Sequence, residues 1–477
     1  MATEGVFRLQ PVSRVVIALA CALMLAGCGE DKATQQQSPQ SAPGVLKSPT
    51  VPTAPQLSFV HVIVFDGDMS KPVRGALVRV GSHAGRTGRD GVAKIRIGRH
   101  ERLPVSVAKR GYDPFKQRLQ FRGKPKVGVR VYQTKLQWRL YGATPGRTQA
   151  HPFIHVRPPF RVVWSQAVGG LMEFPAAVDD DVAFVSNYHG SVRAYSMRDG
   201  AKVWRRDTAG KMAASPTVAG EEIVAHGMDG RVYVLNRHNG RVHWSYDTGA
   251  PIESSPLVLD GVDYFGTWNG TVYALDLRTH RPRWTYRSGS KITSSASFLN
   301  GTIYIGDYGG RLRALTAGTG ALRWSGSVNG RIYGTPAAAN GRVFVTSSTG
   351  GSLTGFSTGG SRLWSLGTGS YVYSSPAVWN GRVYFGSYNG TFYAVSARNG
   401  TVGWRFTTEG AIAGAASIVD GVVYFSNRQH RIYGLNARTG KQIFRFPDGA
   451  FVPLSGNARR LLLHGFSRLY AVEHKRR

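Results

Sequence analysis

The stretch Ile252-Glu253-Ser254-Ser255-Pro256-Leu257-Val258 begins the unit that decides the fold. A turn at Asp260-Gly261, a second apolar run around Tyr264-Phe265-Gly266, a turn at Asn269-Gly270 and two further runs follow it, up to Trp284. Asx-Gly pairs favour type I′ hairpins, because both central residues of such a turn need a positive φ. The stretch therefore predicts four short antiparallel strands that form one small sheet.

This unit repeats along the chain, and a tryptophan marks the period of forty residues. The tryptophans are Trp164, Trp204, Trp244, Trp284, Trp324, Trp364 and Trp404, and Phe444 takes the eighth position. Self-similarity at such a period is typical of a repeat architecture, and small sheets repeated radially form a β-propeller. Each tryptophan falls on a fourth strand, where we expect it to dock on the neighbouring blade and stabilise the ring.

The number of blades follows from the order of the strands. Seven full units run from 171 to 445, and an eighth from 451 to 472 has three candidate strands. The run Phe160 to Trp164 stands before the first unit and supplies the missing strand. We predict an all-β protein whose residues 160–477 form an eight-bladed β-propeller with four-stranded blades, closed by this N-terminal strand in the last blade, without long free edges.

Two segments have the residue pattern of a known repeat: Tyr273-Ala274-Leu275-Asp276, and Thr319-Gly320-Ala321-Leu322-Arg323-Trp324. They resemble the pyrroloquinoline-quinone (PQQ) type propeller repeat. That superfamily contains quinoprotein dehydrogenases and non-enzymatic scaffolds such as the BamB-type lipoprotein of the outer-membrane barrel-assembly machinery. The resemblance implies the fold and leaves these two functions open.

The N-terminus has the features of an export signal. Arg8 and Arg14 precede an apolar run from Val15 to Leu25, which is too short to span a bilayer and suits a signal peptide. Leu25-Ala26-Gly27-Cys28 resembles the bacterial lipobox. We expect a signal peptide over 1–28, lipidation of Cys28 and a membrane-anchored, extracytoplasmic protein, with the choice of inner or outer membrane open. An ordinary secretory signal is the alternative.

Three further segments precede the repeats. Residues 29–57 are rich in Gln, Ser, Pro and Ala, which predicts a disordered tether. Residues 58–140 show alternating apolar residues at 59–65, 76–80, 92–97, 105–108 and 127–132, which predicts a small basic β-sandwich. Lys71 to Val80 and Thr87 to Ala93 resemble carboxypeptidase-regulatory-like modules, which are usually non-catalytic. Residues 141–159 carry four prolines and read as a Pro-rich linker.

Composition limits the chemistry. The formal net charge is +33, from 60 Lys and Arg against 27 Asp and Glu, which favours anionic partners. The two cysteines, Cys21 and Cys28, lie in the export signal, so cysteine-based metal sites and nucleophiles are excluded from the repeats. Because no nucleic-acid recognition motif is present and the chain is expected to be exported, we exclude nucleic acid as a partner.

Two periodic positions are expected to meet at one mouth of the propeller channel: the residues that lead into each first strand, and the turn between strands two and three. They place aromatic, cationic and acidic side chains in one rim, as interaction surfaces favour. The candidate binding residues are Glu173, Tyr188, Lys211, Glu253, Trp268, Lys291, Tyr308, Arg331, Tyr333, Tyr373, Tyr388 and Arg428. The alternative is that the turn aromatics only cover adjacent blades.

The sequence favours a non-catalytic scaffold that binds an envelope protein or peptide, and that acts as a monomer without cofactor or metal. Recognition of an anionic cell-wall glycan or polymer is the alternative. A PQQ-dependent dehydrogenase is a lesser alternative, because such an enzyme needs a general base beside calcium ligands. Glu173 and Glu253 are the two carboxylates at the inner rim positions, and the forty-residue period leaves no room for the long excursions that such enzymes carry.

Overall fold

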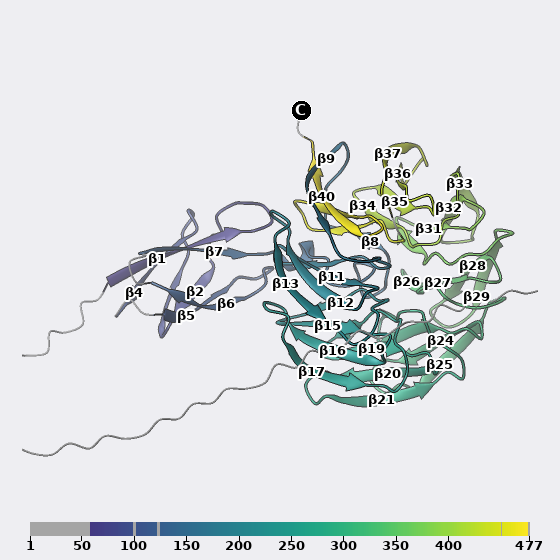
Figure 1. The fold of residues 1–477 in the computed structure, drawn as a ribbon, viewed down its shortest axis with the longest axis horizontal. Coiled ribbons are helices and arrows are strands. Elements are labelled where there is room, and N and C mark those ends of the chain that lie inside the picture. Colours follow the sequence, from purple (N-terminus) through teal and green to yellow (C-terminus); the bar gives the residue numbers. More distant parts are fainter. Residues whose placement is uncertain (1–57, 99–101, 122–124, 450, 476–477) are drawn as a thin grey trace, which may run out of the picture. The chain divides into compact units, whose positions relative to one another are not determined.

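The computed structural model describes residues 58–98, 102–121, 125–449 and 451–475 (Figure 1). The expected signal peptide, Cys28 and the expected tether lie outside the described residues. All described residues belong to one compact unit, Pro55–Arg477. Their regular secondary structure consists of β-strands and one short 3₁₀ turn, η1 (Thr134–Leu136), so the predicted all-β class is confirmed.

Two sheets form the N-terminal part, which we call the N-terminal sheet pair. One sheet has the order β4-β1-β7, with bounds Val92–Ile97, Ser58–Asp66 and Lys126–Val131. The other has the order β3-β2-β5-β6, with bounds His83–Arg86, Leu77–Val80, Arg102–Ala108 and Phe115–Gln120. Strand β1 is antiparallel to β4 and parallel to β7, and every second residue of it, Val60, Val62 and Val64, is buried in a shared core.

The sequence did not predict β3 or β6. Strand β3 reads HAGR and has no buried residue, and β6 reads FKQRLQ, in which only Phe115 and Leu119 are partly buried. Both strands lie at edges of their sheet, where one row of backbone groups pairs and the side chains face solvent. The apolar alternation that identifies a half-buried strand is therefore weak in both.

From Ala150 to His474 the described residues form eight sheets, each of which we interpret as one blade. The first four are β10–β13, β14–β17, β18–β21 and β22–β25, with bounds Ala177–Asp179, Val182–Asn187, Ser191–Ser196, Lys202–Asp207; Thr217–Ala219, Glu222–His226, Arg231–Asn236, Val242–Asp247; Leu257–Leu259, Val262–Gly266, Thr271–Asp276, Arg281–Arg287; and Ser297–Leu299, Thr302–Gly306, Arg311–Thr316, Leu322–Ser327.

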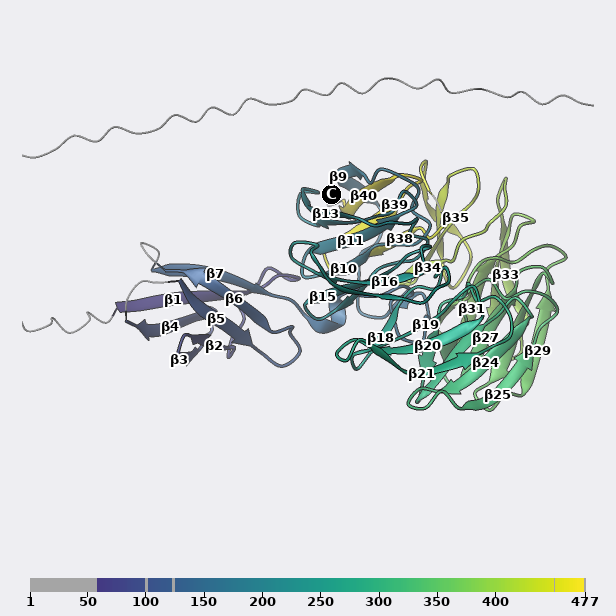
Figure 2. The same ribbon diagram turned by 60° about the horizontal axis from the view of Figure 1, so that its bottom comes forward.

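The other four sheets continue in chain order around the ring (Figure 2). They are β26–β29, β30–β33, β34–β37 with β8, and β38–β40 with β9, with bounds Ala337–Ala339, Arg342–Ser347, Ser352–Ser357, Arg362–Gly367; Ala377–Trp379, Arg382–Gly386, Thr391–Ser396, Val402–Thr407; Ser417–Val419, Val422–Ser426, Ile432–Asn436, Gln442–Phe446, Ala150–His151; and Leu454–Gly456, Leu461–His464, Arg468–His474, Phe160–Ala167. Each is a meander of antiparallel strands, and β8 adds a parallel edge to the seventh.

The ring closes between its first and last sheets. Strand β9 pairs antiparallel with β40, with Trp164 opposite Ala471, so the predicted pairing of the N-terminal strand with the last sheet is confirmed. The first strands of these two sheets, β10 and β38, are also in contact. The pairing of β9 with β40 covers the edge that the last sheet would otherwise expose.

Most of the repeated tryptophans link their sheet to the next one through the indole N–H. Six of them donate to a backbone carbonyl of the following sheet at 2.7 to 3.3 Å: Trp164, Trp204, Trp284, Trp324, Trp364 and Trp404. Trp244 stacks instead on His280 of the next sheet, with ring centroids 4.2 Å apart. Phe444 packs on Phe160 of β9. The tryptophans of the repeats therefore act as connectors between sheets, and of these only Trp164 and Trp204 are buried, while the others are partly exposed.

A second set of connections lies nearer to the axis and repeats with the same period. The backbone N–H of Ser255 donates to the hydroxyl of Ser295 at 2.8 Å, and the N–H of Ser295 donates to the hydroxyl of Thr335 at 3.1 Å. The same bond joins Ser215 to Ser255 and Thr335 to Ser375. These five hydroxyl residues form a chain of hydrogen bonds across five successive sheets, which we call the hydroxyl belt.

Residues 138–151, which we call the inner segment, lie against the innermost strands. The second residue of a first strand donates its N–H to a carbonyl of the inner segment in five sheets: Val218 to Arg139, Phe298 to Pro145, Ala338 to Gly146, Val378 to Thr148 and Ile418 to Gln149. Trp138 exchanges two such bonds with Val178. We expected a Pro-rich linker over 141–159; the structure shows that most of this segment is also built into the ring.

Arg147 anchors the inner segment. Its side chain is fully buried and donates to the carbonyls of Tyr141, Ser255, Pro256 and Ala296. Burial lowers the pKa of Arg147 to about 10, so the guanidinium keeps its charge at neutral pH. A cation that satisfies four carbonyls fixes the inner segment to the third and fourth sheets.

Candidate functional site

The two periodic sets of rim residues lie side by side. In seven sheets the N–H of the turn between strands two and three donates to the carbonyl of the residue that leads into the first strand, at 2.7 to 3.0 Å. The pairs are Tyr188 with Leu171, Met228 with Lys211, Trp268 with Pro251, Tyr308 with Lys291, Ser348 with Arg331, Tyr388 with Tyr371, and Arg428 with Ala411. The structure therefore brings the predicted residues to one mouth of the ring.

Cations and aromatic rings alternate around this rim. The Nζ of Lys291 lies 3.2 Å from the centroid of the Trp268 ring and 5.2 Å from that of Tyr308. The Cζ of Arg331 also lies over the Tyr308 ring, 5.4 Å from its centroid. Lys211 lies over Tyr188 at 5.1 Å, and Arg428 over Tyr388 at 5.9 Å, where its Nη1 also donates to the Tyr388 hydroxyl. Such pairs hold the cations in place with their charges still available to a partner.

Tyrosines complete the rim on the side of the sixth sheet. Tyr373 packs edge to face on Tyr333 and is 5.0 Å from Tyr388, measured between ring centroids. Tyr371, which is not among the predicted binding residues, contacts both Tyr373 and Tyr388 and is 52% exposed. In the forty-residue period Tyr371 occupies the position of Lys211, Lys291 and Arg331, and this spacing is the sequence signal that could have identified it as a rim residue.

Below the cations, two carboxylates share one phenol. The Tyr333 hydroxyl lies 3.1 Å from Oε1 of Glu173 and 2.8 Å from Oε1 of Glu253. The second oxygen of Glu253 accepts a hydrogen bond from the Trp268 indole at 3.0 Å. The three residues come from the segments before β10, β18 and β26, which belong to three sheets that are not adjacent in the ring. We call this group the Glu173–Tyr333–Glu253 bridge.

The bridge is less exposed than the cations around it. Glu253 is buried and Glu173 and Tyr333 are half-buried, whereas Lys211, Arg331 and Arg428 are exposed. Burial raises the pKa of Glu173 to about 7, helped by the charge of Glu253 and opposed by the Tyr333 hydrogen bond. Burial also raises the pKa of Glu253, against the effect of its hydrogen bonds and of Lys291. The bridge therefore holds a proton at a pH where ordinary glutamates have lost theirs.

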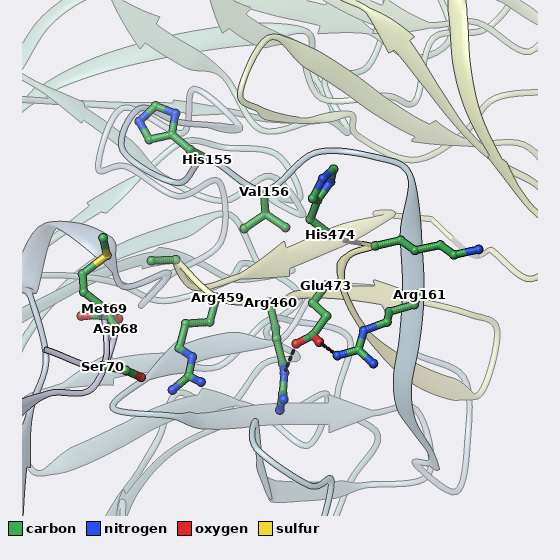
Figure 3. A pocket seen from close by; sticks show the side chains of 12 residues that line it. Asp68, Met69, Ser70, His155, Val156, Arg161, Arg459, Arg460, Glu473 and His474 are labelled. Atoms are coloured by element: carbon green, nitrogen blue, oxygen red, sulfur yellow. Dashed lines mark hydrogen bonds and ion pairs between the residues drawn. The ribbon is translucent and has the colours of Figure 1, made fainter. Parts of the chain in front are cut away.

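A cavity of about 1040 Å³ lies away from the rim (Figure 3). In Figure 3, Glu473 lies between Arg161 and Arg460, with which it forms ion pairs. Arg460 also donates to the carbonyls of Met197 and Arg198, so most of its hydrogen-bonding capacity is used within the chain. The cavity is lined by Asp68, Met69, Ser70, His155, Val156, Arg161, Ala458, Arg459, Arg460, Glu473, His474 and Lys475.

Three carboxylates, Asp113, Asp179 and Asp180, come close enough together to suggest a cation site. Arg139 pairs with Asp113 and, at 2.7 Å, with Asp179, while Arg237 pairs with Asp179 at 2.9 Å and with Asp180 at 3.2 Å. Because each of the three carboxylates already pairs with a guanidinium group, we interpret the cluster as an ion-pair network that joins the N-terminal sheet pair to the first two sheets of the ring.

Solved structures show the same fold. BamB from Moraxella catarrhalis matches with a TM-score of 0.57 and 20% identity, over 67% of this chain and 99% of that one. Quinohemoprotein alcohol dehydrogenase from Comamonas testosteroni matches with a TM-score of 0.62 and 14% identity, over 72% and 81%. A europium-containing methanol dehydrogenase matches with a TM-score of 0.59 and 13% identity, over 69% and 89%. At these identities the likeness concerns the fold alone.

A comparison with curated proteins gives no match to this sequence. Within the described residues, no helix has the length and apolar character needed to cross a membrane. A family model described as outer membrane protein assembly factor BamB matches residues 160–295, 268–376 and 351–473. Together these matches span about two thirds of the chain and reach every sheet of the ring, while the N-terminal sheet pair and the inner segment lie outside them. The chain therefore belongs to the BamB family of PQQ-like β-propellers.

Proposed function

We propose that this chain is a non-catalytic scaffold at the cell envelope that binds a protein or peptide through the rim. The observation that carries the proposal is the alternation of cations and aromatic rings around one mouth of the ring, above the Glu173–Tyr333–Glu253 bridge. Aromatic residues and arginine dominate the energetics of protein interfaces. The BamB family gives general support for protein–protein interaction.

Lipid anchoring through Cys28 belongs to the same proposal. It would hold the ring near a membrane surface while residues 29–57 give it reach, and the rim would then meet a membrane-associated partner. The proposal includes a monomeric scaffold and leaves open which membrane holds the anchor. Replacing Cys28 with serine and following the chain between soluble and membrane fractions tests this part.

The rim itself is tested by site-specific photo-crosslinking in cells. A photoreactive side chain at Tyr371, which is 52% exposed at the rim, should capture an envelope protein. One placed at Leu363, which is 44% exposed on β29, the outer strand of its sheet, is the matched control and should not capture it. Capture should be lost when four rim aromatics become alanine: Tyr188, Trp268, Tyr308 and Tyr388. Unchanged capture of the envelope protein by a folded quadruple variant would contradict the proposal.

Recognition of an anionic cell-wall polymer is a second candidate function, because the cavity in Figure 3 has a cationic lining. Four lining residues carry a positive charge (Arg161, Arg459, Arg460 and Lys475) against two carboxylates, Asp68 and Glu473. Binding of this kind weakens as salt screens the charges. Co-sedimentation with purified wall polymer should fall at high salt and in an Arg459→Gln, Lys475→Gln variant. Arg398→Gln, on an exposed turn of the ring, is the control.

A PQQ-dependent dehydrogenase remains the lesser alternative that fold similarity alone suggests. Such an enzyme needs a carboxylate base and metal ligands close to the cofactor. At the rim of this chain, the Tyr333 hydroxyl contacts both inner carboxylates and the Trp268 indole donates to Glu253, so both carboxylates are engaged within the protein. Dye reduction after addition of PQQ and calcium would argue for the enzyme.

A further inference from the structure

The bridge contains a hydrogen-bonding conflict. The Tyr333 hydroxyl has one proton to donate, yet it lies within hydrogen-bonding distance of a carboxylate oxygen of both Glu173 and Glu253. If both glutamates were ionised, one of the two contacts would set a lone pair of the phenol against a negative oxygen. The conflict disappears when one glutamate carries a proton and donates it to the phenol oxygen.

The surroundings decide which glutamate carries the proton. Glu253 accepts from the Trp268 indole and lies near Lys291, and both interactions favour its ionised form. Glu173 has the Tyr333 contact and faces the charge of Glu253, which favours its neutral form. The free protein therefore has a bridge with one proton and one negative charge. The other titratable and charged groups around it are Tyr188, Lys291, Tyr308 and Tyr373, and Arg331 lies beyond them over Tyr308.

We propose that the Glu173–Tyr333–Glu253 bridge receives one positively charged side chain, an arginine or lysine, from the bound partner segment, and that acidic residues flank this side chain. The inference rests on the proposed function, since it assumes that a partner segment lies on the rim. A guanidinium group that reaches both carboxylates takes the electrostatic role of the retained proton, which then leaves Glu173 for the buffer.

The acidic flanks follow from the arrangement of charge. Lys211, Arg331 and Arg428 are exposed around the less exposed bridge, and Lys291 lies over the Trp268 ring beside it. An isolated cation would meet these four positive charges before it reached the carboxylates. A segment with carboxylates on either side of a basic residue pairs its flanks with the outer cations and its centre with the bridge, and such complementarity selects the partner.

Synthetic peptides test this inference on the full chain. The probe is Asp-Asp-Arg-Asp-Asp, and its matched control carries citrulline, which has the shape of arginine without its charge. We expect the arginine peptide to bind roughly tenfold more tightly than the citrulline peptide at about pH 8, and less selectively at about pH 6. At about pH 6, where Glu173 of the free protein still holds its proton, calorimetry in buffers of different ionisation enthalpy should show proton release with the arginine peptide alone.

Three variants connect the result to the bridge. Glu253→Gln should remove the preference for arginine, and Glu173→Gln, which resembles the protonated state, should abolish the proton release. Glu409→Gln, on an exposed turn at the same mouth of the ring, should change neither. A melting curve for each variant shows that it is folded.

Equal affinity of the two peptides, or no measurable binding of either, contradicts the inference. Selectivity that survives in folded Glu253→Gln contradicts it as well. The proposed function fails separately, when crosslinking at Tyr371 does not depend on the rim aromatics. If that crosslinking depends on the aromatics while the two peptides bind alike, the rim is the docking surface and the bridge is a structural contact.

Discussion

Gly320 lies against the indole of Trp284 in the preceding sheet, so closely that a Cβ atom on Gly320 would fall 2.6 Å from Cδ2 and Cε3 of the ring. Its φ of +73° is also one that residues with a side chain rarely adopt. The same contact recurs between Trp164 and Gly200, and between Trp404 and Gly440. Each tryptophan therefore docks on a turn whose glycine is required for two independent reasons.

Gly320→Ala should destabilise the protein by about 2 to 4 kcal/mol, because the new methyl group collides with Trp284 and the backbone is strained. Gly318→Ala, in the same turn, has nothing within 4 Å of its new Cβ and should be nearly neutral. Urea unfolding of the two variants makes the comparison. Similar losses in both would show that the indole contact is not the cause.

Ser295→Ala should cost about 1 to 3 kcal/mol, because it leaves the buried N–H of Ser255 without an acceptor. The hydroxyl belt would be interrupted between the third and fourth sheets. Ser361→Ala, at an exposed turn, serves as the control and should change the free energy of unfolding very little. A loss no larger than that of the control means that the belt adds nothing to stability.

Arg147→Met should be among the most damaging single changes, with a loss of about 3 kcal/mol or more, since four carbonyls lose their donor in a buried place. Arg147→Lys keeps the charge, but its single ammonium group cannot reach all four carbonyls, so an intermediate loss is expected. Thermal unfolding measures both, with Arg398→Met on an exposed turn as the control. A fully stable methionine variant would contradict the anchoring role.

The raised pKa of Glu173 makes stability depend on pH. The folded state holds the proton up to about pH 7, whereas the unfolded chain releases it near 4.5, so this stabilising contribution is complete below the unfolded value and is lost as the pH rises through about 7. Glu173→Gln should therefore be more stable than the natural chain by about 2 kcal/mol at pH 8, and show little difference at about pH 5. The free energy of unfolding of both proteins, measured in urea at several pH values between about 5 and 8, tests this prediction. Parallel curves for the two proteins would disprove the linkage.

The periodic part of the fold could be predicted because each unit repeats its own chemistry. The Asx-Gly turns are the clearest example: Asp260, Asn300, Asn340, Asn380 and Asp420 all adopt a positive φ, as type I′ hairpins require. The forty-residue period also predicted that Tyr308 and Lys291 lie together at the rim, as the structure places them. Polar edge strands such as β6 could not be predicted, because their pairing depends on neighbours that the local pattern does not reveal.

The inner segment was beyond sequence reasoning for a different reason. Prolines 145, 152, 158 and 159 have the composition of a linker, and nothing local indicates that the carbonyls of Pro145 and Gly146 accept hydrogen bonds from the innermost strands. The bridge was predicted only in part. Glu173, Glu253 and Tyr333 were assigned to the rim, but their common contact depends on side-chain reach across sheets that are not adjacent.

The pairing of β9 with β40 sets an order of events for the folding chain. Arg161 of β9 pairs with Glu473 of β40, 312 positions away, so β9 has no partner strand until nearly all of the repeats exist. Contacts between such distant residues form slowly, because the loop must close before they give any stability. A chain that is synthesised from its N-terminus therefore carries a β9 without its partner strand for most of its synthesis. Until β40 is made, β9 keeps an open edge, and another strand could pair with it there.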